Sequence, residues 1–340
     1  MRKSFILIAI ILLFSTVSAE QGDFTIVVLP DTQKYSRDFP EIFNSQTEWI
    51  AENAESMNIV FVSHLGDIVD DYDSVEQWQN AGTSMGFLDG KVAYGIAPGN
   101  HDFSREGDIS NFNFYFPPSR FNSHSWYGGN FPFGSNENSF QLFSASGLDF
   151  IVLHLRYCPG KAALQWANQV LRTHSDRLAI ISTHAYLGLN GEREVHSYKE
   201  SGCGTGSNNT EYIWDELIYP NENVFLVLCG HVHGEAGRVD PNIAGKPVLQ
   251  VLSDYQSLEN GGNGFLRIMR FSPTQRKISV QTYSPSLNQF ELDNDSQFSL
   301  EFSPGPKPEP NPFPVELAAG IAAIAAAGFA AAFLKKTGKI

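Results

Sequence analysis

Five apolar runs in this chain each stop at a residue that can bind a metal ion, and this pattern constrains the fold most strongly. Each run has the length of a buried strand. Ligands of open α/β sheets gather at the carboxyl ends of the strands, so we expect the five residues on one rim of the fold. They are Asp31, Asp67, Asn100, His184 and His231.

Strand-like runs alternate with helical patterns along most of the chain, which predicts an α/β fold. The first six predicted strands are 24–29, 59–65, 92–97, 150–155, 178–182 and 224–228. Later segments alternate like strands of a more antiparallel sheet, at 247–252, 264–271 and 277–283. Amphipathic patterns predict helices at 46–57, 162–174 and 211–217.

The polar residues belong to short motifs: DTQ from residue 31, GDIVD from 66, GNHD from 99 and GHVH from 230. An Asn amide beside an imidazole is an unusual choice for a plain turn. Two histidines at i and i+2 point to the same side of an extended backbone, which suits two neighbouring ions. Each motif alone is common in turns and helix caps. The ordered set, each member at a strand end, predicts a metal centre.

In this order the motifs resemble those of the calcineurin-like metallophosphoesterase superfamily, which run D-x-H, G-D-x-x-D, G-N-H-D/E, H and G-H-x-H. The resemblance covers residues 24–239. It implies a four-layer αββα sandwich, with two β-sheets inside and helices outside, and a metal site at the carboxyl ends of the strands. It also implies hydrolysis of phosphate monoesters or diesters by a hydroxide that bridges two divalent ions.

The resemblance assigns metal ligands position by position, with Asp67 shared by both ions. The first ion would be bound by Asp31, Gln33, Asp67 and His233, and the second by Asp67, Asn100, His184 and His231.

Two further residues receive catalytic roles from the resemblance. His101 would not bind metal but would stabilise or protonate the leaving oxygen. Asp70 would hydrogen-bond His101, orient it and raise its pKa.

Gln33 stands where most members of the superfamily have histidine, and Asp71 where many have arginine. An amide oxygen is a weaker and harder ligand than imidazole, so manganese, magnesium or iron could replace zinc at the first position. Gln33 is also the one feature that favours an alternative, a non-catalytic surface binding module on the same scaffold. Retention of His101 and Asp70 favours the enzyme, because metal binding alone needs neither.

The N-terminus has the pattern of a signal peptide. Two basic residues precede an apolar run from residue 5 to residue 14, and Val17-Ser18-Ala19 is a small-residue cleavage site. We expect residues 1–19 to be removed; the alternative is an uncleaved N-terminal anchor.

The C-terminus has the pattern of a membrane anchor after a metallophosphoesterase domain at residues 20–302. A Pro-rich linker spans 303–314, and the apolar segment 315–334 is long enough to cross a bilayer. The lysines in 335–340 place that tail in the cytoplasm and the domain outside the cell membrane. A helix-packing segment or a processed tail are the alternatives.

Charge and cysteines add two constraints. The net charge of −14 argues against a stable nucleic-acid partner, although bound cations could still attract a phosphate ester. Cys158 and Cys203 fall in loop-like sequence and either pair as a disulfide or lie apart, while Cys229 is read as a buried strand residue. Sequence predicts no oligomeric state.

Two segments are candidates for the substrate-binding rim. Residues 112–140, rich in aromatic side chains, follow the Asn100-His101 motif and either roof the site or pack on the side of the domain. Residues 188–209, rich in Gly, Asn and Ser, follow His184.

Overall fold

The computed structural model describes residues 22–193 and 210–303. The predicted signal peptide, the predicted membrane helix and cytoplasmic tail, and all but the first residue of the Pro-rich linker lie outside these ranges. So do most of segment 188–209 and Cys203.

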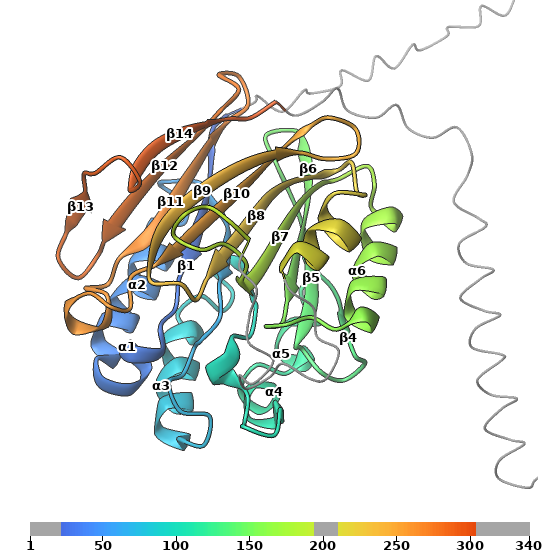
Figure 1. Ribbon diagram of the computed structural model, residues 1–340. Helices are drawn as coiled ribbons and strands as arrows, with labels where there is room; N and C mark the ends of the chain where they lie inside the picture. The colour runs from blue at the N-terminus through green and yellow to red at the C-terminus, as the bar shows by residue number, and fades with distance from the viewer. Residues whose placement is uncertain (1–21, 194–209, 304–340) are drawn as a thin grey trace, which may run out of the picture. The chain divides into compact units, whose positions relative to one another are not determined.

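Two seven-stranded mixed sheets form the body of the fold (Figure 1). The first sheet has the order β13-β12-β11-β1-β2-β3, and β14 also pairs with β12. Its strands are β1 (Phe24–Leu29), β2 (Ile59–His64), β3 (Ala93–Ile96), β11 (Leu266–Ser272), β12 (Lys277–Ser284), β13 (Gln289–Glu291) and β14 (Gln297–Glu301).

The second sheet has the order β4-β5-β6-β7-β8-β10-β9. Its strands are β4 (Tyr127–Phe131), β5 (Asn138–Ala145), β6 (Leu148–Leu155), β7 (Leu178–Ala185), β8 (Val224–Gly230), β9 (Gly234–Pro241) and β10 (Pro247–Asp254).

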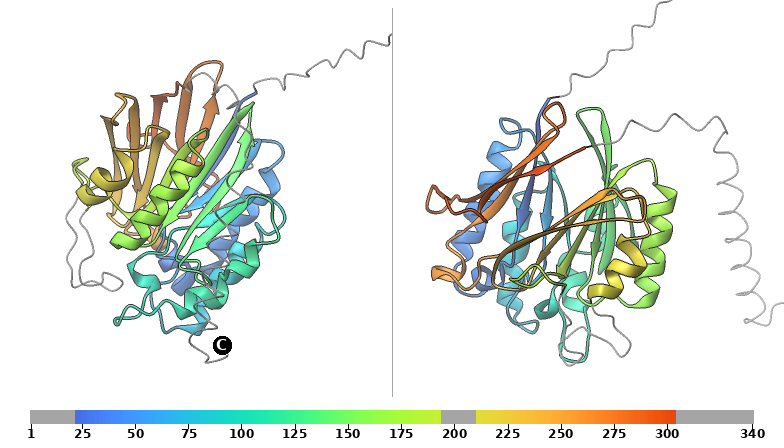
Figure 2. Two further views of the ribbon diagram at one scale, coloured as in Figure 1. Left: turned by 90° about the vertical axis from the view of Figure 1, so that its right-hand side faces the viewer. Right: turned by 45° about the horizontal axis from the view of Figure 1, so that its top comes forward.

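Helices cover the outer face of each sheet, as the views in Figures 1 and 2 show. Against the first sheet lie α1 (Gln33–Asp38), α2 (Pro40–Asn53) and α3 (Val75–Gly86). Against the second lie α6 (Lys161–Thr173), α7 (Thr210–Ile213) and a π-helix (Trp214–Ile218). Shorter helices are α4 (Ser110–Tyr115), α5 (Pro118–Phe121) and the 3₁₀ turns Asn100–Asp102 and Glu259–Gly261.

Three apolar clusters separate these four layers. Along β1, Ile26 and Val28 face the second sheet, whereas Val27 and Leu29 pack under α2 and α3. Successive side chains of a strand point to opposite faces, so a continuous apolar run belongs to a strand buried on both sides. The predicted four-layer αββα sandwich is therefore confirmed.

Parallel pairing directs the predicted metal ligands to one rim. In the first sheet β1, β2 and β3 run parallel, and in the second β6, β7, β8 and β10 do. Residues that follow these strands therefore emerge at common edges, and the hydrogen bond from the main chain of His231 to Asp31 joins the two edges.

The structure corrects one predicted segment and adds an element. Residues 112–140 are not a long loop, because most of α4, then α5, β4 and the start of β5 lie there. Phe112, Phe116 and Phe121 are buried against the first sheet, which favours the packing alternative over a roof. Helix α1 begins at Gln33, the last residue of the first motif, where sequence predicted no helix.

Candidate metal centre

Asp102 holds the loops after β2 and β3 in a fixed relation. Its Oδ1 accepts hydrogen bonds from the amides of Ile68 (2.9 Å) and Val69 (3.2 Å), and its Oδ2 accepts one from Gly99 (2.8 Å). Burial, reinforced by the Asp67 carboxylate, raises the pKa of Asp102 to about 7. Sequence gave this residue no role, yet it sets where Asp67 stands relative to the 99–102 turn.

The backbone at the centre is unusually constrained. Asp67 and His231 both have left-handed φ angles, 48° and 72°, which cost energy for residues with a Cβ atom and cluster at functional sites. A Cβ atom on Gly99 would lie 2.2 Å from Oδ1 of Asp67, and one on Gly230 would lie 2.2 Å from Oδ1 of Asp31. These glycines are therefore needed because carboxylates pack directly against the main chain.

His184 is the centre of the predicted second-ion site. Its Nδ1–H donates to the carbonyl of Leu65 (3.0 Å), so Nε2 is the ring nitrogen left to bind a metal ion. Around Nε2 lie Oδ1 of Asn100 at 3.0 Å, Nδ1 of His231 at 3.1 Å and Oδ2 of Asp67 at 3.3 Å. The ligand atoms of Asp67, His184 and His231 all lie within 4.8 Å of one another. Acceptors that converge in this way fit a divalent cation.

Asp67 and the histidines of this group shift one another's pKa values toward the charged forms. Burial lowers the pKa of His184, but the neighbouring Asp67 carboxylate outweighs it and raises the net pKa above the ordinary value. Burial alone would raise the pKa of Asp67, but His184, His101 and His231 hold it below its ordinary value. Asp67 therefore stays ionised at neutral pH.

The predicted first-ion site is arranged differently. Oδ2 of Asp31 accepts from the amide of His231 (2.9 Å), and Nε2 of Gln33 donates to Asp70 (3.3 Å). Oδ1 of Asp31 and Oε1 of Gln33 are buried and have no hydrogen-bond partner within the described part of the chain. Buried oxygens without a partner are costly. Their chemistry fits a hard cation, so Gln33 has an oxygen available for the role predicted for it.

Sequence analysis missed Asp254 and Gln256, which adjoin Asp31. Asp254 ends β10 and is 1% exposed. Nε2 of Gln256 donates to Oδ2 of both Asp31 (3.2 Å) and Asp254 (3.0 Å). Burial and the Asp254 carboxylate raise the pKa of Asp31 well above its ordinary value. The signal was present, since Asp254 follows an apolar run just as the other site residues do.

His233 is not presented as the i, i+2 rule predicted. His231 has a left-handed φ, and residues 231–233 lie between β8 and β9 outside both strands. The extended-backbone argument is therefore wrong for this segment: His231 is partly buried, whereas His233 is exposed. His233 does interact electrostatically with Asp254, which places it on the Asp31 side of the centre.

His101 is held at the centre by main-chain contacts. Its amide donates to Oδ1 of Asp67 (2.9 Å), and its Nδ1–H donates to the main-chain carbonyl of Asp70 (2.7 Å). His101 thus donates to the main-chain carbonyl of Asp70, and not to its carboxylate as predicted.

The Asp70 carboxylate instead faces cations, accepting from Lys34 (2.6 Å) and Arg37. Burial alone would raise the pKa of Asp70, but Lys34 and Arg37 hold it below its ordinary value. This difference arises because α1, which sequence did not predict, carries both cations.

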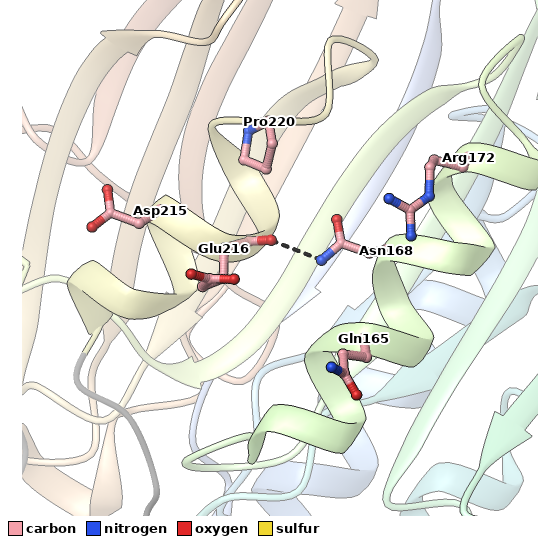
Figure 3. A pocket seen from close by; sticks show the side chains of 6 residues that line it. All are labelled: Gln165, Asn168, Arg172, Asp215, Glu216 and Pro220. Atoms are coloured by element: carbon pink, nitrogen blue, oxygen red, sulfur yellow. Dashed lines mark hydrogen bonds between the residues drawn. The ribbon is translucent and has the colours of Figure 1, made fainter.

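A separate shallow pocket lies between α6 and the π-helix (Figure 3). Its lining is polar, and Nδ2 of Asn168 donates to the carbonyl of Glu216 across it (2.7 Å). None of the candidate metal ligands lines it. The pocket therefore does not belong to the metal centre.

The structure also bears on the cysteines and the membrane. Cys158 is disulfide-bonded, and Cys229 is free and buried within the described ranges. Among residues 22–193 and 210–303, no helix has the length and apolar character needed to cross a bilayer.

Comparisons with known proteins agree with the motifs. The model of the calcineurin-like phosphoesterase family matches residues 24–235. The uncharacterized protein YvnB of Bacillus subtilis (strain 168) is 38% identical over 298 residues, which are 84% of this chain but only 22% of that protein. A purple acid phosphatase from yellow lupin seeds shares the fold, with a TM-score of 0.52 at 14% identity over 84% of this chain and 55% of the lupin chain. The chain therefore belongs to the calcineurin-like phosphoesterase family.

Proposed function

We propose that this protein hydrolyses phosphate monoesters or diesters with two divalent metal ions bound at the shared rim of its sheets. One observation carries the proposal: atoms of Asp67, Asn100 and His231 converge within 3.3 Å of Nε2 of His184. The amide of His101 binds Asp67 beside them. When bound, the ions would supply Lewis-acid chemistry, neutralising phosphate charge and making water a better nucleophile.

His101 is the residue we assign to proton transfer. Because its Nδ1–H is committed to the Asp70 carbonyl, Nε2 is the ring nitrogen left to donate to a leaving oxygen. The bond from its amide to Asp67 ties the position of the ring to the ligand shared by both ions. Asp70 therefore acts as a positioning residue through its main chain.

Lys34 and Arg37 support the same site electrostatically. Without them, the Asp70 carboxylate would face an incoming phosphate as an uncompensated negative charge. Their contacts with both oxygens of Asp70 remove that repulsion and leave part of each cation exposed to solvent. Arg37 also pairs with Asp38 (2.6 Å), so the two cations balance two carboxylates and no uncompensated acid faces an anionic substrate here.

The location we propose is outside the cell membrane, with a C-terminal anchor. The signal-peptide pattern of 1–19, the apolar segment 315–334 and the lysines after it support this placement. The disulfide at Cys158 supports it independently, because disulfides persist mainly in oxidising compartments. We propose manganese or iron as the ions, and zinc as the alternative, since Gln33 offers a hard oxygen ligand.

A second candidate function is a non-catalytic binding module on this scaffold. Gln33 favours it, because a weaker first-ion site could be left empty. The precise seating of His101 against Asp67 and Asp70 favours the enzyme, since a purely structural centre would not need that imidazole.

Metal-stripped protein, assayed with bis-p-nitrophenyl phosphate and p-nitrophenyl phosphate, tests the proposal. Manganese, zinc, magnesium or iron(II) would be added back separately, with no metal as the baseline. We expect metal-restored turnover that Asp67→Asn abolishes, and the preferred ester will distinguish a monoesterase from a diesterase. Folded, metal-loaded protein that hydrolyses neither ester with any metal would favour the binding module.

A further inference from the structure

The buried acid Asp254 has no role in the metal centre described so far, although it contacts a predicted ligand. It is the last residue of β10, which runs parallel to β8, so both strands end at the rim where His231 and His233 follow. In the antiparallel pair with β9, Asp254 stands opposite Gly234, the residue after His233. The strand pairing therefore places the Asp254 carboxylate near His233, on the side of the proposed first ion.

Asp254 is paired with Asp31, a predicted ligand of the first ion. Its carboxyl and that of Asp31 touch each other, and the Gln256 side-chain amide binds one oxygen of each. The Gln256 main-chain amide also donates to Oδ1 of Asp254 (2.9 Å). Asp31 and Asp254 are 2% and 1% exposed. Two buried carboxylates side by side need a cation or a shared proton between them.

Independent evidence comes from unpartnered atoms of two predicted first-ion ligands. Oδ1 of Asp31 and Oε1 of Gln33 are buried without a hydrogen-bond partner in the described residues. The described cations of α1 do not serve the pair, because Lys34 and Arg37 are bound to Asp70. A divalent ion would satisfy both orphan oxygens and the negative charge of the carboxylate pair together.

We propose that Asp254 is an additional ligand of the first ion and compensates for the imidazole that Gln33 lacks. Gln256 then positions Asp254 and Asp31 to bind this ion. This inference rests on the proposed metal centre. The first position then becomes rich in oxygen, with donors from Asp31, Gln33, Asp67 and Asp254. Oxygen ligands suit manganese and magnesium, whereas imidazoles suit zinc, so the first position selects a hard cation.

The test compares bound metal per chain, by mass spectrometry after equilibrium dialysis, in wild type, Asp254→Asn and Asp240→Asn. Asp240 lies towards the opposite end of the β9–β10 pair and contacts Arg193, Arg238 and Gln250, so it is the matched control. We expect two manganese ions in wild type and in Asp240→Asn. In Asp254→Asn, one ion should bind at least about tenfold more weakly or be lost.

A rescue variant makes the assignment specific. In Gln33→His/Asp254→Asn, the new imidazole should restore ion binding at the first position. The metal preference of that position should shift toward zinc. Failure of this double variant to recover an ion would overturn the claim that Asp254 substitutes for an imidazole.

Unfolding temperatures separate a ligand from a structural acid. Without metal, Asp254→Asn should unfold at a higher temperature than wild type, because one of two adjacent buried acids is gone. With manganese, its gain in unfolding temperature should be smaller than that of wild type. A metal-free variant that is less stable or fails to fold would assign Asp254 to the fold and overturn the inference.

The remaining outcomes are also decisive. Two ions bound with unchanged affinity in Asp254→Asn would overturn this inference and leave the proposed function intact. If the wild-type protein binds no ion, both this inference and the proposed function are overturned.

Discussion

The two halves of the metal centre differ in how complete they are without an ion. On the second-ion side, His184 is fixed by the Leu65 carbonyl, and its neighbours already converge on Nε2. On the first-ion side, the carboxyl groups of Asp31 and Asp254 are in contact, and two buried oxygens find no hydrogen-bond partner among the described residues. One half is rich in imidazole and electrically balanced, whereas the other is rich in oxygen and brings two buried acids together.

This difference indicates separate tasks for the two positions. An imidazole-rich site holds its ion through neutral nitrogen donors and retains its shape when the ion leaves. An oxygen-rich site with crowded acids depends on its ion for stability, so it responds to metal supply and to pH. Asp67 is the proposed ligand of both ions, and substitutions can separate the two halves.

Asp67→Asn should have the largest effect, because Asp67 is the one residue proposed to bind both ions. We expect the variant to bind neither ion at one per chain and to show no detectable ester hydrolysis. Metal content and turnover measured on the same sample check this. If Asp67→Asn kept both ions, Asp67 would not be the shared ligand.

His101→Ala should separate chemistry from ion binding. Its proton-transfer role predicts a kcat lower by about 10²–10⁴-fold with both ions retained. The matched control is His174→Ala, because His174 caps α6 away from the centre. Unchanged kcat in His101→Ala, with ions in place, would remove this residue from the mechanism.

Gly230→Ala should disturb the first-ion side selectively. The new Cβ atom would lie 2.2 Å from Oδ1 of Asp31, so the carboxylate has to move. We expect one ion to be lost while the His184 side keeps its own. Gly237→Ala is the control, because its nearest neighbour would be 3.9 Å away. Equal metal content in both variants would argue against Asp31 as a ligand.

The stabilisation by manganese should increase with pH. Burial raises the pKa of the proposed ligands Asp31 and Asp254. In the metal-free fold these carboxyls keep protons that the unfolded chain releases above about pH 4, so their contribution to stability falls as pH rises. Manganese holds the ligands ionised and removes this penalty. A manganese-induced gain in Tm that is equal at pH 5 and pH 8 would contradict the charge argument.

Lys34→Met should have the smallest effect. The Lys34–Asp70 pair is partly exposed and Arg37 remains, so the free energy of unfolding should change by less than about 1 kcal/mol. Ion content should not change. A lost ion would show that Lys34 helps to place Gln33, its neighbour on α1.

Much of this architecture follows from local sequence signals. The run 24–29 was predicted with the observed bounds of β1, because continuous apolar residues that stop at Pro-Asp leave little ambiguity. The strand ends also located Asp31, Asp67, Asn100, His184 and His231 at one rim. These predictions depend only on chain direction and periodicity.

Other features depend on contacts that sequence does not encode locally. Asp254 and Gln256 meet Asp31 only because β10 runs parallel to β8 across the second sheet, a pairing between distant segments. The left-handed φ of His231 overrides the alternation expected for residues 231 and 233. Helix α1 was missed because it is six residues long and begins within a motif interpreted as a metal loop.

The most direct test of the account is the rate of bis-p-nitrophenyl phosphate and p-nitrophenyl phosphate hydrolysis measured against manganese ions bound per chain. If both positions are needed in one active site, hydrolysis of the preferred ester should be slow with up to one bound ion per chain. The hydrolysis rate should then increase steeply as the second ion binds. Full turnover at one ion per chain, or none at two, would contradict it.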